Sequence, residues 1–440
     1  MKQLLYIFVL LLYGCGGGGG DSDISASQPT QFSPNSTTQR PMLLIRLSYD
    51  NSTFHNDAAT WQRKMFGFNT HELNSYFQEV SYNHFHFIPV HESEGRPDDG
   101  IISITLQRPH PDSAKESSIH FDLAEAVRLA DEYIDFAAYD SDHNGALNPQ
   151  ELQLIFIVAG NEDAYSGPNA SLGVWAHASC TERSNTPMVD GVALMGCHIQ
   201  SNYALFGERH GTHDATIGII AHELGHAAFN LPDLYDTTDE SGGVGYFALM
   251  GAGMWGQNGL GDLPGATPTH LCAWSKTALQ WVTPTTIIHA DNLHVTMHAS
   301  ASETFNIIKL PISKSEYFLV ENRHNSGYDR GLTAISYYFE GGLAIWHIDE
   351  NTIVTHFSDN TVNADAAHKG VDLEEAAFAV LDDNVNAKGN RENLFYSGNV
   401  DAFTPYTNPS SAAYNGASSG IYIESITSPS SVMSALISHE

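Results

Sequence analysis

The chain has 440 residues, of which 42% are hydrophobic and 10% aromatic, so it can bury real cores and is not disordered throughout. It carries 19 Lys and Arg against 51 Asp and Glu, and this net charge of -32 argues against nucleic acid and anionic membrane surfaces as partners. The length allows two domains, or one large domain with a smaller one attached.

The N-terminus has the form of an export signal. Lys2 precedes an apolar run from Leu4 to Tyr13, which is too short to cross a bilayer as a helix. The run ends in LYGC, which resembles the lipobox of bacterial lipoproteins, where the cysteine is lipidated after cleavage. We therefore expect a lipoprotein signal over residues 1–15, lipidation at Cys15 and anchoring at the bacterial cell envelope, in the outer membrane. A plain secretory signal, leading to secretion, is the alternative.

The rest of the chain alternates helical and strand patterns. Residues 16–40 are rich in Gly, Ser, Thr and Gln and are predicted to be a flexible linker. Hydrophobic periodicity then predicts a strand over 41–49, a helix and a strand within 70–90, an amphipathic helix over 121–139, a buried strand over 152–160 and a helix over 214–230 with Asp214 as its N-cap. From about Ile287 short β-rich runs predict a β-rich C-terminal part, 286–440. The fold class is α+β.

The sequence DSDHNGALNPQE, residues 140–151, fits the loop of an EF-hand position by position. Gly145 stands where that loop turns sharply. The predicted calcium ligands are Asp140, Asp142, Asn144, the carbonyl of Ala146, and Glu151. Because a strand pattern follows, we expect a single calcium loop inserted between other elements, which braces the structure. A turn rich in Asp and Asn, without an ion, is the alternative.

Four cysteines are present. If Cys15 is lipidated, three remain, and an exported protein permits disulfides. We predict a disulfide between Cys180 and Cys197 and a buried free thiol at Cys272.

The sequence HELGH places two histidines four residues apart on the predicted helix 214–230. Residues at this spacing lie on one face, so His222 and His226 can both bind one metal ion. A catalytic zinc takes three protein ligands and a water molecule, whose pKa it lowers. Glu223 lies beside the ligands and is predicted to take the proton of that water as general base. The rest of the helix is apolar, and polar side chains buried there would be costly without a metal or other partners.

The stretch HELGHAAFNLPDLYD resembles the zinc motif of the immune-inhibitor-A-like family of bacterial secreted metallopeptidases, a metzincin-like group. GYFALMGAGMWG, residues 245–256, resembles the family's Met-turn, and further blocks match between Pro41 and Ile426. The resemblance implies a metzincin-like catalytic domain with a mixed sheet over 41–285, followed by the β-rich subdomain 286–440. It also implies one catalytic zinc, with Met250 beneath it.

The third zinc ligand departs from the family pattern HExxHxxGxxD. Phe229 takes the place of the glycine, and one residue is added. Asn230 can replace glycine at the end of a helix because asparagine tolerates the left-handed conformation. Asp233 follows Asn230 by three residues and is the predicted ligand; Asp236 or a distant carboxylate are the alternatives.

These inferences predict a zinc-dependent endopeptidase that hydrolyses protein or peptide substrates outside the cell. It would contact a membrane only through its lipid anchor. The competing hypothesis is a non-catalytic, calcium-braced surface-binding lipoprotein that keeps the peptidase fold.

Overall fold

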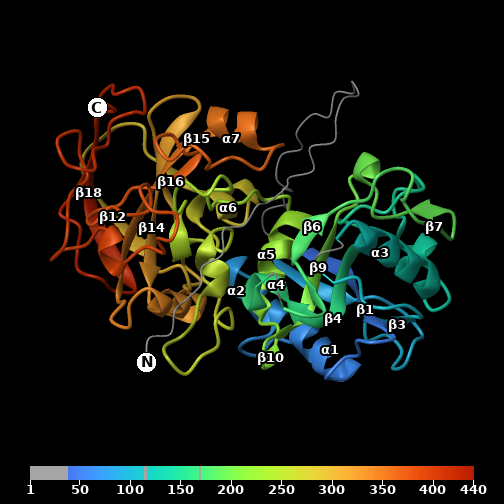
Figure 1. Cartoon of the computed structure of the whole chain (residues 1–440). Helices are drawn as coiled ribbons and strands as arrows, with labels where there is room; N and C mark the ends of the chain where they lie inside the picture. The colour runs from blue at the N-terminus through green and yellow to red at the C-terminus, as the bar shows by residue number, and fades with distance from the viewer. Residues whose placement is uncertain (1–37, 113–115, 168–169) are drawn as a thin grey trace. The chain divides into compact units, whose positions relative to one another are not determined.

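The computed structural model describes residues 38–112, 116–167 and 170–440 (Figure 1). It divides into two compact units. The first unit contains residues 38–78 and 83–230, and the second contains residues 79–82 and 231–440. The predicted signal peptide, Cys15 and most of the predicted linker lie outside the described residues. Within the described ranges, no helix is both long and apolar enough to cross a membrane.

The first unit is built on a mixed eight-stranded sheet with the central order β10-β9-β4-β1-β2. Strands β1, β2, β3, β4 and β9 run parallel, whereas β6 and β10 pair antiparallel with β9. Their bounds are β1 Thr38–Tyr49, β2 Phe85–Pro89, β3 Ile101–Leu106, β4 Gln153–Glu162, β5 Gly173–Val174, β6 His177–Ser179, β9 Tyr203–His210 and β10 His213–Asp214, and β7 Met188–Val189 with β8 Val192–Ala193 form a separate hairpin.

Helices pack against this sheet. They are α1 Ala58–Phe66, α2 Leu73–Val80, α3 Glu116–Ala130, α4 Asp163–Ser166 and α5 Ile217–Ala227, with 3-10 turns at η2 Phe136–Tyr139 and η3 Cys197–Ile199. Side chains alternate between the faces of a strand, and Leu43, Ile45 and Leu47 of β1 share one buried cluster with Leu123 and Val127 of α3. Helix α5 contacts β9 and β6.

Three predicted boundaries were wrong. Strand β1 begins at Thr38, within the predicted linker. The helix predicted over 121–139 ends at Ala130, and Phe136, which continues its apolar spacing, is buried from a separate 3-10 turn instead. Asp214 is not the N-cap of α5, because it lies in β10 and accepts hydrogen bonds from Asn56 Nδ2; the N-cap is Thr216.

The second unit is β-rich, as predicted. A five-stranded sheet has the order β11-β13-β14-β15-β16, and a three-stranded sheet has the order β12-β18-β17. The strands are β11 Thr285–Thr286, β12 Ala290–His298, β13 Ile308–Pro311, β14 Glu316–His324, β15 Gly341–Asp349, β16 Val371–Leu373, β17 Ile421–Glu424 and β18 Val432–His439. The helices and 3-10 turns are α6 Ala273–Ala278, α7 Glu350–His356, η4 Gly245–Phe247, η5 Ala252–Trp255, η6 Gly327–Ala334 and η7 Arg391–Asn393.

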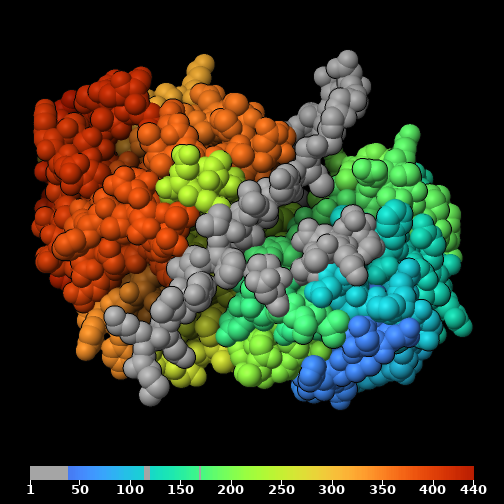
Figure 2. All heavy atoms as spheres, viewed as in Figure 1, coloured from blue at the N-terminus to red at the C-terminus, as the bar shows by residue number. Residues whose placement is uncertain are grey.

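Residues 231–285 group with the β-rich strands in the second unit, and the predicted domain boundary at residue 286 stays a prediction. In the space-filling view, the C-terminal residues, orange to red, make up much of the visible surface of this unit (Figure 2).

Candidate metal centre

Helix α5 carries the two histidines. Its residues are almost all buried, and the apolar ones, such as Ile220 and Leu224, fix the helix in the core of the first unit. His222 and Glu223 are 2% and 5% exposed, so their polar atoms need partners inside the protein. A metal ion held by the two imidazoles would provide such a partner for His222.

The two imidazoles converge. Nε2 of His222 and Nε2 of His226 are 3.2 Å apart, and the rings stand at 88° to each other. Two nitrogen ligands about 2.0–2.1 Å from a tetrahedral zinc are about 3.3 Å from each other. The two rings are therefore spaced as ligands of one zinc ion are.

A carboxylate lies next to the imidazoles. Ligand atoms of His222, His226 and Asp233 all lie within 4.8 Å of one another, and Asp233 is 3% exposed. The chain reaches this position through Asn230, which has φ of 54° and donates its backbone N–H to the carbonyl of His226 (2.9 Å). The left-handed asparagine predicted from the sequence is thus present, one residue later than the family's glycine.

Asp236, the alternative ligand, is used otherwise. Its Oδ1 accepts hydrogen bonds from the backbone and hydroxyl of Thr238, and its Oδ2 from the backbone N–H groups of Glu240 and Ser241. These bonds close the following turn. Among the described residues, Asp233 and not Asp236 joins the histidines in a group that could hold a metal.

Phe229, at the family's glycine position, anchors the end of α5. Its ring is fully buried against Phe77 and Phe85, with centroids 5.3 and 4.9 Å away. The guanidinium of Arg40, from β1, lies over the rings of Phe229 and Phe85 and donates a hydrogen bond to the carbonyl of Ala228. Burial lowers the pKa of Arg40 to about 9. Phe229 therefore fills an aromatic pocket at the helix end.

Glu162, at the end of β4, is a buried acid in electrostatic contact with Glu223, and the sequence analysis did not identify it. Its carboxyl accepts hydrogen bonds from the backbone N–H groups of Ala164, Ala176 and Gly207, at 3.0, 3.0 and 2.7 Å. Burial raises the pKa of Glu162 to about 8, and the charge of Glu223 adds to this rise, although the three donors favour the ionised form. Glu162 thereby ties β4, β9 and the start of β6 together beside the candidate base.

Met250 is fully buried, and its place beneath the metal stays a prediction. Its carbonyl accepts a hydrogen bond from the backbone of Leu234 (2.8 Å), one residue after Asp233. The segment around Met250 therefore lies beside the segment that carries the candidate carboxylate ligand.

Residues 108–283 match the family model of the immune inhibitor A peptidase M6 catalytic domain. The chain carries an immune inhibitor A-type peptidase domain. The predicted resemblance to this family is confirmed, and the protein is a metallopeptidase. Such a peptidase needs a metal, and the group formed by His222, His226 and Asp233 could hold it.

Solved structures add little to this M6 assignment. Wild-type OgpA from Akkermansia muciniphila is 14% identical and aligns over 73% of this chain and 92% of its own, with a TM-score of 0.30. Catalytically inactive OgpA in complex with an O-glycopeptide substrate, glycodrosocin, is 15% identical over 73% and 92%, with a TM-score of 0.29. A similarity this low supports no conclusion about this peptidase. The comparison with curated proteins finds no match.

The predicted calcium loop of the peptidase lies between η2 and β4. Carboxylate oxygens of Asp140, Asp142 and Glu151 lie within 4.8 Å of one another and could hold an ion. Gly145 has φ of 79°, which suits the sharp turn. The oxygens also accept backbone hydrogen bonds within the loop, for example Asp140 from Asn144 (3.1 Å) and Glu151 from Ser141 (2.9 Å). This arrangement fits both a calcium loop and a turn rich in Asp and Asn, so calcium stays a prediction.

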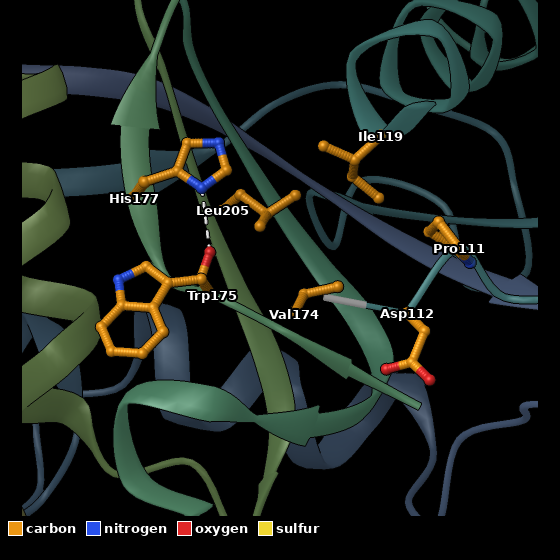
Figure 3. A pocket seen from close by; sticks show the side chains of 7 residues that line it. All are labelled: Pro111, Asp112, Ile119, Val174, Trp175, His177 and Leu205. Carbon is orange, nitrogen blue, oxygen red and sulfur yellow. Dashed lines mark hydrogen bonds between the residues drawn. The ribbon is translucent and has the colours of Figure 1, made fainter. Parts of the chain in front are cut away.

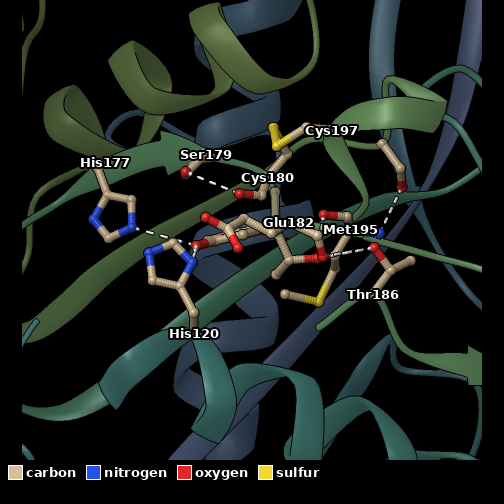
Figure 4. Close-up of a disulfide and its surroundings, with 11 residues drawn as sticks. His120, His177, Ser179, Cys180, Glu182, Thr186, Met195 and Cys197 are labelled. Atoms are coloured by element: carbon tan, nitrogen blue, oxygen red, sulfur yellow. Dashed lines mark hydrogen bonds between the residues drawn. A yellow bond between two sulfur atoms is a disulfide. The ribbon is translucent and has the colours of Figure 1, made fainter. Parts of the chain in front are cut away.

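The predicted calcium loop packs against the β7–β8 hairpin. The backbone of Leu147 donates to the carbonyl of Ala193 (2.8 Å), and that of Ala193 donates to the carbonyl of Gly145 (2.9 Å). The hairpin lies inside the loop closed by the disulfide between Cys180 and Cys197, whose Cα atoms are 4.9 Å apart (Figure 4). Cys272 is a buried free thiol, as predicted.

A small cavity is lined by residues of β5, β6, β9 and α3. Its volume is about 10 Å³, which is room for roughly one water molecule, so it cannot hold a peptide. His177 lines it together with Val174, Leu205 and four other residues, and its Nδ1 is 2.9 Å from the carbonyl of Trp175 (Figure 3). Burial lowers the pKa of His177 to about 4, so this half-buried ring is neutral at neutral pH.

Proposed function

We propose that the protein is a zinc-dependent endopeptidase that hydrolyses peptide bonds of extracellular proteins, with Glu223 as general base. The observation that carries this proposal is the 3.2 Å spacing of the two imidazole Nε2 atoms, with the carboxylate of Asp233 beside them. Two nitrogens at this spacing, with a carboxylate oxygen within 4.8 Å of them, form a ligand set that suits a zinc ion with an open fourth position. The helix-borne HExxH, an aspartate ligand and Met250 together support a metzincin-like catalytic domain.

In this proposal the residues of the site have distinct roles. His222, His226 and Asp233 would hold the ion, which when bound supplies Lewis acidity toward a water molecule and the scissile carbonyl. Glu223, next to the first ligand, would take the proton of the attacking water and deliver it to the leaving amine. The neighbouring carboxyl of Glu162, whose pKa is raised to about 8, would be mostly protonated at neutral pH and would add little competing negative charge.

Two further parts of the proposal concern the protein's setting. We place one structural calcium ion in the loop Asp140–Glu151, on the evidence of its converging carboxylates. We place the protein outside the cytoplasm, lipid-anchored through Cys15 to the bacterial envelope, on the evidence of the N-terminal sequence alone. Labelling of the cells with a fatty-acid analogue should mark the wild type and not Cys15→Ala.

The test of the peptidase uses residues 16–440, as wild type, Glu223→Ala, Asp233→Asn and Asp236→Asn. Zinc content and casein hydrolysis are measured on the folded fraction of each. Glu223→Ala should keep its zinc and lose hydrolysis by at least about 100-fold, the lower range of general-base contributions. Asp233→Asn should lose zinc, and Asp236→Asn, the matched control, should keep it. If the wild type holds zinc but cuts no casein beyond the background seen with Glu223→Ala, the site is not a peptidase site for such substrates. The protein is then better described as a non-catalytic surface-binding lipoprotein.

A further inference from the structure

Asn360, in the second unit, forms two hydrogen bonds with Asp233. The backbone N–H of Asp233 donates to Oδ1 of Asn360 (2.8 Å), and Nδ2 of Asn360 donates to Oδ2 of Asp233 (2.6 Å). One side-chain amide therefore fixes both the backbone and the carboxylate of the same residue. The two residues are 127 positions apart in the sequence.

Asn360 is itself held in place. It follows helix α7, and its backbone donates to the carbonyl of Phe357 (3.2 Å). Its own carbonyl accepts a hydrogen bond from the hydroxyl of Thr237 (3.2 Å), on the segment that carries Asp233. Its φ of 54° lies in the left-handed region, which asparagine adopts more readily than most residues. The position thus favours asparagine both for its backbone conformation and for its amide.

We propose that Asn360 is a positioning residue of the zinc site, which orients Asp233 toward the metal. The inference rests on the proposed function, because it takes Asp233 as the third ligand. Hydrogen-bond partners of metal ligands fix the orientation of those ligands, and their loss typically weakens metal binding about 10- to 100-fold. A neutral amide suits this task. It holds one carboxylate oxygen without adding a positive charge, which would compete with the metal.

Two substitutions distinguish the effect of the Asn360 side-chain amide on zinc binding from the effect of its left-handed backbone conformation. Asn360→Gly keeps access to the left-handed conformation and removes the amide. Asn360→Asp keeps the shape but places an acceptor where Nδ2 now donates, so two carboxylates would face each other. Asn292→Gly is the matched control, because Asn292 also has a left-handed φ, of 50°, and its side-chain amide donates to Asp291, not to Asp233.

The experiment uses residues 16–440. It measures their zinc affinity by competition with a chromophoric chelator, and the melting temperature of the zinc-free protein. Asn360→Gly should bind zinc about 10- to 100-fold more weakly, and Asn360→Asp more weakly still. Asn292→Gly should match the wild type. In an Asp233→Ala background, Asn360→Gly should cause no further loss.

Wild-type zinc affinity in both Asn360 variants would overturn the inference. If Asn360→Gly does not fold, Asn360→Asp decides by the same criterion. Asp233→Ala shows whether the positioning role of Asn360 alone is wrong, or whether Asp233 is not the third zinc ligand. Loss of zinc in Asp233→Ala with none in the Asn360 variants rejects only the positioning role. Unchanged zinc affinity in Asp233→Ala rejects the third ligand itself.

Discussion

Arg40 in β1 donates a hydrogen bond to the backbone carbonyl of Ala228, at the C-terminal end of the helix that carries His222 and His226. The last carbonyls of a helix have no partners within it and carry partial negative charge. A buried guanidinium, packed between aromatic rings, supplies both a donor and a positive charge there. The position of the two candidate ligands therefore depends on a residue from the first strand of the sheet.

We predict that Arg40→Met destabilises the protein by about 1–3 kcal/mol, because a hydrogen bond from a charged donor is lost. It should also weaken zinc binding, since the end of α5 loses its anchor. Arg46→Met is the matched control: Arg46 also lies in β1 and donates to a backbone carbonyl, but to that of Asn56 and not to one at the C-terminal end of α5. Chemical denaturation and zinc competition measure the two effects. Equal zinc affinity in Arg40→Met and Arg46→Met would contradict the prediction.

Glu162 should make the stability of the protein depend on pH. Its pKa is raised to about 8 in the folded state by burial, so the folded protein binds one proton more than the unfolded chain between pH 4.5 and 8. The free energy of unfolding should therefore fall as the pH rises through this range, by at most about 1.4 kcal/mol per pH unit for one proton. Glu162→Gln removes the titrating group.

Urea unfolding of the zinc-free protein at pH 5, 6, 7 and 8 checks this. We expect the wild type to lose more stability than Glu162→Gln between the lowest and highest pH. If the free energy of unfolding changes equally with pH in the two proteins, Glu162 keeps an ordinary pKa.

Calcium should stabilise the protein through Glu151. An ion at a hundred times its dissociation constant adds about 2.7 kcal/mol to the free energy of unfolding. We expect the melting temperature to rise with calcium in the wild type and to rise much less in Glu151→Gln, which loses a bidentate ligand. Glu132→Gln, at an exposed position outside the loop, makes the same change in charge and should respond as the wild type does. If the melting temperature of the wild type changes with neither calcium nor chelator, the ion-free turn is favoured.

The disulfide should support the same loop. It joins cysteines 17 residues apart and encloses Ala193, which bonds to the backbone of the predicted calcium loop. Cys197→Ser should therefore lower stability by about 3 kcal/mol and weaken calcium binding as well. Cys272→Ser, which leaves the disulfide intact, is the control, and isothermal calorimetry measures calcium affinity. Calcium affinity unchanged in Cys197→Ser would show that the loop holds its shape without the hairpin.

The sequence predicted features that depend on residues close together in the chain. The spacing of His222 and His226 predicted a shared helix face, and the tolerance of asparagine for positive φ predicted the turn at Asn230. The helix predicted over 121–139 was too long because Phe136 continues the apolar spacing, although it is buried from a 3-10 turn beyond the end of α3.

The residues that the sequence analysis missed act at long range. Arg40 contacts Ala228 from 188 positions away, and Asn360 contacts Asp233 from 127. Glu162 ends an ordinary buried strand, and nothing in its local pattern marks it as an acid beside Glu223. Such pairings depend on the sheet order and the path of the loops, which hydrophobic periodicity does not specify.

The position of Asn360 bears on how relatives of this peptidase are compared. The segment that identifies the family, 108–283, contains both histidines, Glu223 and Asp233, but stops well short of Asn360. Two homologues could therefore be identical across residues 108–283 and still differ in how firmly the carboxylate of their third metal ligand is oriented. Residues 108–283 alone would give both homologues the same expected metal affinity, whereas residue 360 would distinguish them.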